Sequence, residues 1–246
     1  MKRIVEVCID NIESLPVAVS AGADRIELCS ALALGGLTPT AGYVKKAVEL
    51  SSVPIYSIIR HRGGDFVFNE DEIDLMVADI VLMKQLGASG VVVGALTAEG
   101  EVNTEALQRF MIAADGMGVT FHRAFDLVKN PVEALEIIIK HGCERILTSG
   151  QQAAAAEGTA LIQTLVKQAG GRISIMPGAG INSNNVLHIL QTTEAREFHL
   201  SGKTTRPGKM RASSDVFMGE NAEDDRLVNI TDFGKIRSVV ETLSGC

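Results

Sequence analysis

The sequence predicts an α/β fold, a single closed (β/α)8 TIM barrel with a long excursion after its eighth strand. Three observations support this prediction. Short β-rich runs alternate with helical patterns, eight of each kind can be counted, and several helical patterns end at a glycine followed by a polar residue and a new strand. This alternation implies parallel strands with right-handed crossovers, and eight such units suit a barrel of 246 residues. An open doubly wound sheet is the structural alternative.

The predicted strands are short runs rich in Val, Ile, Leu and Phe. In order, they cover residues 4–9, 25–29, 55–60, 90–95, 119–123, 145–149, 172–177 and 197–201. The connecting segments carry apolar residues at helical spacing. In order, the predicted helices cover residues 12–20, 41–50, 70–86, 104–114, 131–140, 161–168, 184–191 and 231–243. Glycines such as Gly22 and Gly142 mark the points where a helix ends and the next strand begins.

One interval, residues 202–230, breaks this alternation. It shows no clear periodicity and is basic in its first part and acidic in its second. A loop of this length inside a compact domain is usually functional or disordered. We therefore predict an irregular loop over 202–230, within a single domain of residues 1–246, that covers the barrel mouth or reaches a partner subunit. A solvated surface excursion is the alternative.

Composition and charge exclude several classes of function. A net charge of -7 and a pI near 5.3 leave no basic stripe for nucleic acid. No apolar run approaches the roughly 18 residues of a membrane-spanning helix. Glu6 and Asp10 interrupt the first apolar run, unlike the uncharged segment of a signal peptide. We expect a cytoplasmic protein with no membrane or nucleic acid partner, whose four cysteines are thiols rather than a disulfide scaffold.

The first two predicted strands repeat one pattern, Glu6-Val7-Cys8 and Glu27-Leu28-Cys29. Residues two apart in a strand share a face, so each strand places a carboxylate and a thiol on one side. The outer face of a barrel strand lies under helices and must be apolar, whereas the inner face can be polar near the mouth. Both pairs are therefore predicted to point into the barrel.

The same rule assigns further polar residues to the interior. Arg60, His122 and His199 join Glu6 and Glu27 as candidate catalytic residues, because carboxylates, imidazoles and a guanidinium at a barrel mouth can transfer protons on an anionic substrate. The structural alternative is that Glu27 and Arg60 merely pair and that each histidine is a satisfied core residue.

Two segments at the predicted mouth suit anions. Residues 177–182, Pro-Gly-Ala-Gly-Ile-Asn, follow the seventh strand and open a helix, where barrels often bind phosphate, although such a sequence also makes a sharp turn. Residues 60–65 place two guanidinium groups after the third strand, with Asp65 near them. The candidate substrate-binding residues are Arg62, Arg123, Ser149, Gly178, Gly180 and Ser201.

Several long motifs agree with one known family. They are Glu6-Val7-Cys8 and residues 22–29, 35–39, 60–66, 119–126 and 147–150. On these motifs, which extend over nearly the whole chain, the sequence resembles the CutC family, named as copper homeostasis proteins. The resemblance implies a cytoplasmic TIM barrel, an oligomeric assembly, and a Cu(I) site at Cys8 and Cys29.

Two functions follow as expectations. Neighbouring strands lie about 4.8 Å apart, so thiols at matched positions on the first two strands could hold one Cu(I) ion, a soft cation that thiolates favour. The alternative for the two cysteines is that they only fill the core. The second expected function is that of an enzyme, in which the barrel acts on a small anionic, phosphorylated or carboxylated, metabolite through its Glu, His and Arg residues.

Overall fold

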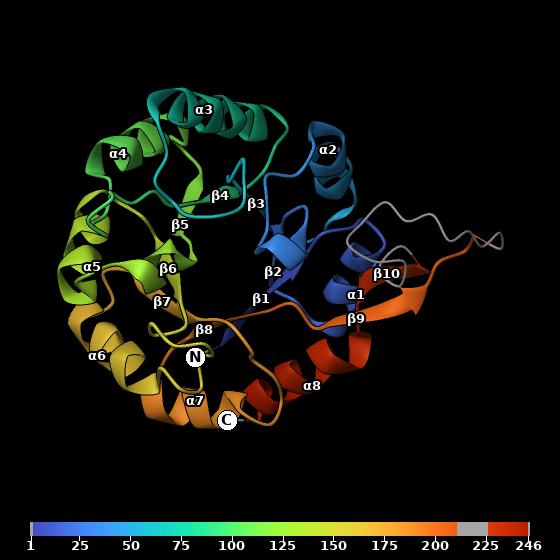
Figure 1. Ribbon diagram of the computed structural model, residues 1–246. Coiled ribbons are helices and arrows are strands. Elements are labelled where there is room, and N and C mark those ends of the chain that lie inside the picture. Colours follow the sequence, from blue (N-terminus) through green and yellow to red (C-terminus); the bar gives the residue numbers. More distant parts are fainter. Residues whose placement is uncertain (1, 211–225, 246) are drawn as a thin grey trace.

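A ring of helices surrounds a barrel of eight parallel strands in the computed structural model (Figure 1). The structure describes residues 2–210 and 226–245. Strand and helix alternate from the first strand to the eighth. The (β/α)8 barrel predicted from this alternation is confirmed, and the open doubly wound sheet is excluded.

The barrel strands are each four to six residues long. They are β1 (Ile4–Ile9), β2 (Arg25–Leu28), β3 (Ile55–Ile58), β4 (Gly90–Val93), β5 (Gly118–Phe121), β6 (Arg145–Thr148), β7 (Ser174–Pro177) and β8 (Glu197–Leu200). Parallel ladders connect them in the order β7-β6-β5-β4-β3-β2-β1-β8, and β7 lies alongside β8 where the ring closes.

In the described part of the chain, eight α-helices cover the outside of the barrel (Figure 1). They are α1 (Ser14–Ala21), α2 (Ala41–Leu50), α3 (Glu70–Gln85), α4 (Thr104–Ala113), α5 (Pro131–Lys140), α6 (Thr159–Ala169), α7 (Val186–Thr193) and α8 (Phe233–Ser244). Local chemistry sets several starts: Asn69 and Glu72 form a capping box at α3, and Pro131 opens α5. Within the described chain, no helix is long and apolar enough to span a bilayer.

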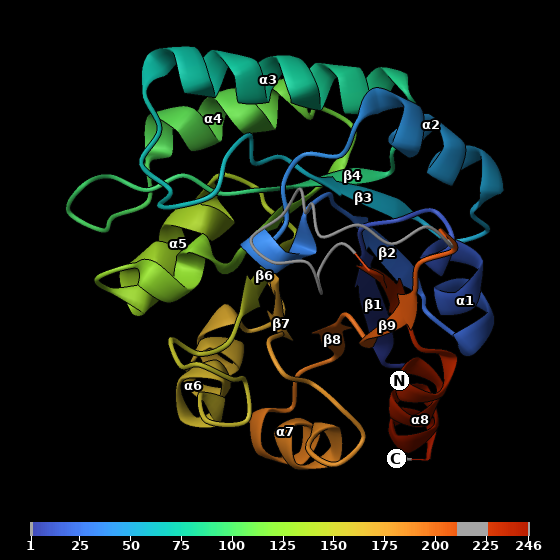
Figure 2. The same cartoon turned by 45° about the vertical axis from the view of Figure 1, so that its right-hand side comes forward.

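The interval after β8 is more regular than predicted. Its ends form an antiparallel hairpin of β9 (Lys203–Pro207) and β10 (Leu227–Thr231), which packs against α1 (Figure 2). The prediction of an irregular loop over 202–230 is therefore wrong at both ends. Four of the five residues of β9 are polar, so apolar alternation, the usual sign of a strand, is missing. Residues 211–225 lie outside the described residues.

The hairpin also corrects the predicted start of the last helix. Thr231 ends β10, and Asp232 caps α8 by accepting a hydrogen bond from the Lys235 backbone N–H at 2.9 Å. In the basic part of this region, Arg206 donates two hydrogen bonds of 2.7 Å to Glu13, the residue that precedes α1. The basic charge of β9 is thus partly used to hold the hairpin on the barrel.

Several barrel strands end one or two residues earlier than predicted. As a result, Arg60, His122, Ser149 and Ser201 follow the last residues of β3, β5, β6 and β8. His122 also precedes a 3-10 segment, Arg123–Leu127, and a second such segment, Leu32–Leu34, follows β2. The candidate residues therefore gather at the carboxyl ends of the strands, the end where barrels build their sites.

The two faces of the strands divide as the alternation predicts. Val5, Val7, Ile26 and Leu28 belong to the large apolar core beneath the helices. Inside the barrel, a small separate apolar cluster contains Cys29, Tyr56, Ile58 and Val92. The rest of the described interior is markedly polar.

A buried ion network fills the closed end of the barrel. Arg25 pairs with Glu6 and, at 2.6 Å, with Glu197, and Arg145 also binds Glu197 at 2.6 Å. Both guanidinium groups lie over the ring of Tyr56, at 5.2 and 5.5 Å from its centroid. Charges buried in this way are tolerated because each has a partner of opposite sign.

Tyr56 needs a glycine opposite it. A Cβ atom at Gly118 would lie 2.1 Å from the Tyr56 hydroxyl oxygen, which donates a 2.6 Å hydrogen bond to Glu144. Burial is the main reason that the pKa of Tyr56 rises to about 12, and the bond to Glu144 adds to it. The absence of a side chain at Gly118 thus leaves room for the Tyr56 ring, which covers both guanidinium groups.

Replacing Glu197 tests the importance of this network. Glu197→Gln removes the anion shared by Arg25 and Arg145, which then keep only Glu6 and Glu144 as carboxylate partners. We expect a loss of about 2 kcal/mol or more in the free energy of unfolding, measured by urea denaturation with an unchanged m-value. Glu136→Gln is the matched control, because Glu136 pairs with Arg172 at the surface, where an ion pair contributes little, and its loss should lower the free energy of unfolding far less. Equal losses in the two variants would contradict the network's role.

Candidate functional site

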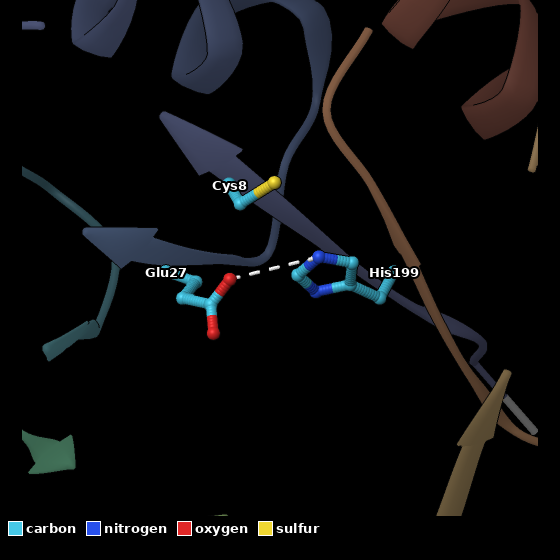
Figure 3. Close-up of side chains that lie close together, drawn as sticks. All are labelled: Cys8, Glu27 and His199. Atoms are coloured by element: carbon cyan, nitrogen blue, oxygen red, sulfur yellow. Dashed lines mark ion pairs between the residues drawn. The ribbon is translucent and has the colours of Figure 1, made fainter. Parts of the chain in front are cut away.

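Three potential ligand atoms converge inside the barrel, from Cys8, Glu27 and His199. The thiol, one carboxylate oxygen and one imidazole nitrogen lie within 4.8 Å of one another, and all three residues are buried. They come from the neighbouring strands β1, β2 and β8, and Figure 3 shows the three side chains pointing toward one another. The Nε2 atom of His199 lies 3.6 Å from Glu27 Oε2. We call this group the Cys8–Glu27–His199 cluster.

Strand register produces this convergence. In the parallel ladders, Cys8 is paired with Glu27 of β2 and Glu6 is paired with His199 of β8. Residues at equal height on neighbouring strands project to the same level of the interior. Sequence alternation placed each residue on the inner face, but the relative height of the strands decides which side chains meet.

Glu6 orients the histidine of the cluster. Its Oε1 atom lies 2.8 Å from His199 Nδ1, which directs Nε2 toward Cys8 and Glu27. Although full burial acts to raise the pKa of Glu6, the charge of Arg25 and the bond to His199 lower it to about 2. Glu6 is thus an anion at neutral pH, and an anion at Nδ1 fixes the ring orientation, as in carboxylate–histidine–metal arrangements.

The cluster itself holds protons. Burial disfavours the charged form of His199, but the neighbouring Cys8 and Glu27 raise its pKa well above its usual value. Burial raises the pKa of the Cys8 thiol, against the effect of His199. Burial is also the main reason that the pKa of Glu27 rises to about 7. A cation bound here would replace protons that the folded protein carries at neutral pH.

Cys29 lies outside the cluster. The expectation of matched positions for the two thiols is wrong, because Cys8 pairs with Glu27 and Cys29 lies two residues further along the chain, just past the end of β2. The Cys29 thiol donates to the backbone carbonyl of Ile9 at 3.4 Å. Burial raises its pKa, and the nearby Cys8, Glu27 and Asp10 raise it further. Whether the two cysteines share a metal ion stays a prediction.

A cavity of about 260 Å³ lies above the cluster at the barrel mouth. Cys8, Glu27 and His199 form part of its wall. Five further predicted site residues line it: Arg60, His122, Arg123, Gly180 and Ser201. Glu6, Cys29, Arg62, Ser149 and Gly178 are not among its lining residues.

Arg62 and Ser149 have structural partners instead of a place at the cavity. Arg62 pairs with Glu72 at 2.6 Å, and its guanidinium carbon lies 4.9 Å from the centroid of the Phe68 ring. The Ser149 hydroxyl lies 2.9 Å from Asp126 and 2.6 Å from the backbone carbonyl of Gln152. The proposed substrate contacts of Arg62 and Ser149 therefore have no support in this arrangement, since both side chains are engaged elsewhere.

Arg60 faces the cavity without a carboxylate partner. Its terminal nitrogens donate to the backbone carbonyls of Leu34, Gly36 and Gly64 at 2.8, 3.3 and 2.9 Å. The predicted alternative, an ion pair between Glu27 and Arg60, is not found among the described residues, where Glu27 faces His199. Arg60 Nε is buried and has no hydrogen-bond partner in the described part of the chain.

His122 also has an unused nitrogen. Its Nδ1 atom accepts a 3.2 Å hydrogen bond from the Ala124 backbone N–H, whereas Nε2 is buried and has no partner within the described residues. Burial, and secondarily the charge of Arg60, lower the pKa of His122 to about 3. His122 is therefore a neutral imidazole that carries its proton on Nε2.

Sequence analysis missed the ion network below the cluster. Arg25, Arg145 and Glu197 are the first residues of β2, β6 and β8, and they face inward. The signal was present in β2, because alternation from the inward residue Glu27 back by two positions reaches Arg25. Lys203, which also lines the cavity, had been grouped only with the basic part of the excursion.

Comparisons with known proteins identify related sequences. A model described as CutC family matches residues 3–204. A protein named as family protein CutC from Pasteurella multocida (strain Pm70) is 51% identical over 235 residues, covering 96% of both chains. The similarly named protein of Vibrio parahaemolyticus serotype O3:K6 is 50% identical over 243 residues, covering 97% of this chain and 98% of its own.

A solved structure from Streptococcus agalactiae, provisionally described as a copper homeostasis protein CutC, is 32% identical to this chain with a TM-score of 0.77. It covers 80% of this chain and 97% of its own. Phosphoribosylanthranilate isomerase from Pyrococcus furiosus is 12% identical with a TM-score of 0.58, covering 99% and 100%. At that identity the likeness concerns the fold alone.

The state of His122 can be measured directly. We expect nitrogen-15 NMR of the imidazole rings to show His122 neutral and protonated on Nε2 from about pH 5 to about pH 8. The unfolded chain would take up a proton near the ordinary pKa of 6.5, and the folded chain only near 3. The stability that this difference confers is therefore present above pH 6.5 and lost as the pH falls toward 3.

His141 serves as the control for this measurement. Its Nδ1 atom lies 2.7 Å from the Ile137 backbone carbonyl, so its neutral form should carry the proton on Nδ1 instead. A titration of His122 near pH 6.5, or the same tautomer for both rings, would show that the described environment of His122 is wrong.

Proposed function

The chain belongs to the CutC family, and on this basis we propose that it is a copper homeostasis protein that binds Cu(I) inside its barrel mouth. The Cys8 thiolate and His199 Nε2 would be the principal ligands. The observation that carries this proposal is the convergence of the Cys8, Glu27 and His199 ligand atoms within 4.8 Å. The description of the Streptococcus agalactiae relative supports the same metal.

The ligand types favour a soft ion. Thiolate and imidazole bind Cu(I) well, whereas carboxylate and carbonyl oxygens suit Mg²⁺ or Ca²⁺. Zn²⁺ prefers four ligands in a tetrahedron, and the cluster offers three. Cu(I) needs fewer soft ligands. Glu27 would then balance the charge of the ion rather than serve as its main ligand.

Of the two inner cysteines, Cys8 is better placed to become a thiolate. His199 lies beside it, and a positive imidazolium stabilises a neighbouring thiolate. The groups that act on Cys29 all raise its pKa, and its surroundings include the apolar Tyr56 and Ile58. Cys29 would contribute as a second sulfur only if its side chain leaves the Ile9 carbonyl.

Location and assembly are part of the same proposal. Cys8, Cys29 and Cys143 are free thiols in the described structure, which supports a reducing, cytoplasmic compartment. The homo-oligomer implied by the family resemblance is proposed on that resemblance alone. An enzymatic activity on a small anionic metabolite remains the alternative, and it depends on the other side of the cavity, at Arg60 and His122.

Variants of the cluster test Cu(I) binding. Under anaerobic reducing conditions, a chromogenic Cu(I) chelator should lose one equivalent of metal to the purified protein. We expect Cys8→Ala to weaken this binding by about a hundredfold or more, because it removes the only thiolate of the cluster among the described residues. Glu6→Gln, which alters the orientation of His199 without removing a ligand, should weaken binding about tenfold to a hundredfold.

Two further variants complete the design. Cys143→Ala is the matched control, because Cys143 is a buried thiol that contacts Met111 rather than the barrel interior. Cys29→Ala distinguishes a Cu(I) site at the Cys8–Glu27–His199 cluster from a Cu(I) site formed by the thiols of Cys8 and Cys29. Unchanged Cu(I) binding in Cys8→Ala would contradict the proposal. Loss of Cu(I) binding in Cys29→Ala, with binding retained in His199→Gln, would show that the metal is held by the two thiols and not by the Cys8–Glu27–His199 cluster.

Cu(I) affinity should also depend on pH. Burial raises the pKa of the Cys8 thiol, and the neighbouring Cys8 and Glu27 raise the pKa of His199 against the effect of burial, so both groups hold protons at neutral pH that the metal must displace. Affinity should therefore rise from about pH 6 to about pH 8, with a slope approaching about two protons per ion. His199→Gln should reduce that slope by about one. A flat pH profile in the same competition assay would show that these two groups are not the ligands.

A further inference from the structure

Arg60 is a buried cation without a counterion. Only 5% of the residue is exposed, and its terminal nitrogens bond to neutral backbone carbonyls. No carboxylate in the described residues forms an ion pair with it, although Arg25, Arg62 and Arg145 all have such partners. A buried charge is costly unless an opposite charge accompanies it. The missing partner is therefore expected to come from outside the described residues, and a bound anion could supply it.

The Arg60 guanidinium group is closely packed by its neighbours. A Cβ atom at Gly35, whose φ is +85°, would lie 3.2 Å from a terminal nitrogen of Arg60. The guanidinium carbon lies 4.9 Å from the Phe66 ring centroid, and the Phe66 ring packs at 4.9 Å against that of His122. Arg60 and His122 thus both pack against one aromatic ring.

Each of these two residues has one unused donor. Arg60 Nε and His122 Nε2 are buried N–H groups with no partner among the described residues, and both residues line the cavity. A buried donor left without a hydrogen bond costs about 1–3 kcal/mol, so such groups in a native site usually indicate a ligand or a bound water. An oxyanion could accept from both.

A second anchor lies in the loop after β7. Ala179 and Gly180 have φ values of +78° and +74°, and the backbone N–H groups of residues 179–181 donate to no described residue. These residues line the same cavity, together with Lys203, whose ammonium group has no ion-pair partner in the described chain. Consecutive backbone N–H groups that lack hydrogen-bond partners beside a cavity can bind an anion.

We propose that the cavity binds a small metabolite through an oxyanion group, a carboxylate or a phosphate, that accepts hydrogen bonds from Arg60 and His122. The residue 179–181 loop and Lys203 hold a second polar group of the same molecule. Glu27 is the one carboxylate in the described lining, against Arg60, Arg123 and Lys203. This inference does not require Cu(I), because none of its donors belongs to the Cys8–Glu27–His199 cluster.

The cavity limits the size of this ligand. Its volume of about 260 Å³ lies at the lower end of the range for small-molecule sites. A molecule with a few carbon atoms and one or two oxyanion groups fits this space. The ligand class is therefore a small carboxylic acid or a small phosphate ester.

NMR titration of metal-free protein tests the site. A strong chelator is present throughout, and inorganic phosphate or malonate is added against chloride at constant ionic strength. We expect the Arg60 Nε–H and His122 Nε2–H resonances to shift together and saturate at millimolar concentrations of at least one probe. A response to phosphate alone or malonate alone identifies the oxyanion, and both results support the site.

Variants then assign the donors. Arg60→Gln should weaken the binding of the responding probe about tenfold to a hundredfold, the loss expected for one charge-assisted hydrogen bond. Arg62→Gln is the matched control and should leave the binding unchanged, because Arg62 pairs with Glu72 away from the cavity. If Arg60→Gln fails to fold, His122→Phe removes the second donor while Arg60 keeps its backbone contacts.

Two results would overturn the proposal. One is the absence of a saturable shift with either probe at tens of millimolar. The other is binding that leaves the Arg60 and His122 resonances unmoved or that Arg62→Gln weakens as much as Arg60→Gln. Neither result bears on Cu(I) binding, which the chelator assay measures separately, so failure of one proposal is distinguishable from failure of the other.

Discussion

The polar interior of this barrel depends on one fully buried carboxylate, Glu6. It pairs with Arg25 on the closed side of the barrel and with His199 on the mouth side. Arg25 keeps the carboxylate ionised despite its burial, and the ionised carboxylate fixes the His199 ring with Nε2 toward Cys8 and Glu27. A structural ion pair and a candidate ligand site are therefore two ends of one hydrogen-bonded chain, and neither can be altered alone.

Charge compensation changes along the barrel axis. At the closed end, Arg25 and Arg145 share Glu197, and Tyr56 covers both guanidinium groups. At the mouth, Arg60 has only neutral partners among the described residues. A fully paired layer requires nothing further, so its role is structural. An incompletely paired layer at the carboxyl ends of the strands is the place where a ligand can complete the charge balance.

The sequence was sufficient for the barrel and for which side chains face inward, because both follow from periodicity. It was not sufficient for register, and register separates Cys29 from the cluster while it brings His199 to Glu6 and Glu27. Arg62 and Ser149 follow the strands as predicted, but Glu72 and Asp126 engage them, and such partners depend on side-chain packing. Strand β9 carries no aliphatic residue and therefore left no readable pattern.

The two proposed sites use different parts of the strand ring. The Cys8–Glu27–His199 cluster comes from β8, β1 and β2, which are neighbours in the sheet order. The unused donors follow β3 and β5, and the N–H groups of residues 179–181 follow β7. A barrel presents the ends of all its strands to one cavity, so sulfur and nitrogen ligands on one arc can coexist with oxyanion donors on the other. The shared cavity is then a consequence of the fold, and each arc keeps its own chemistry.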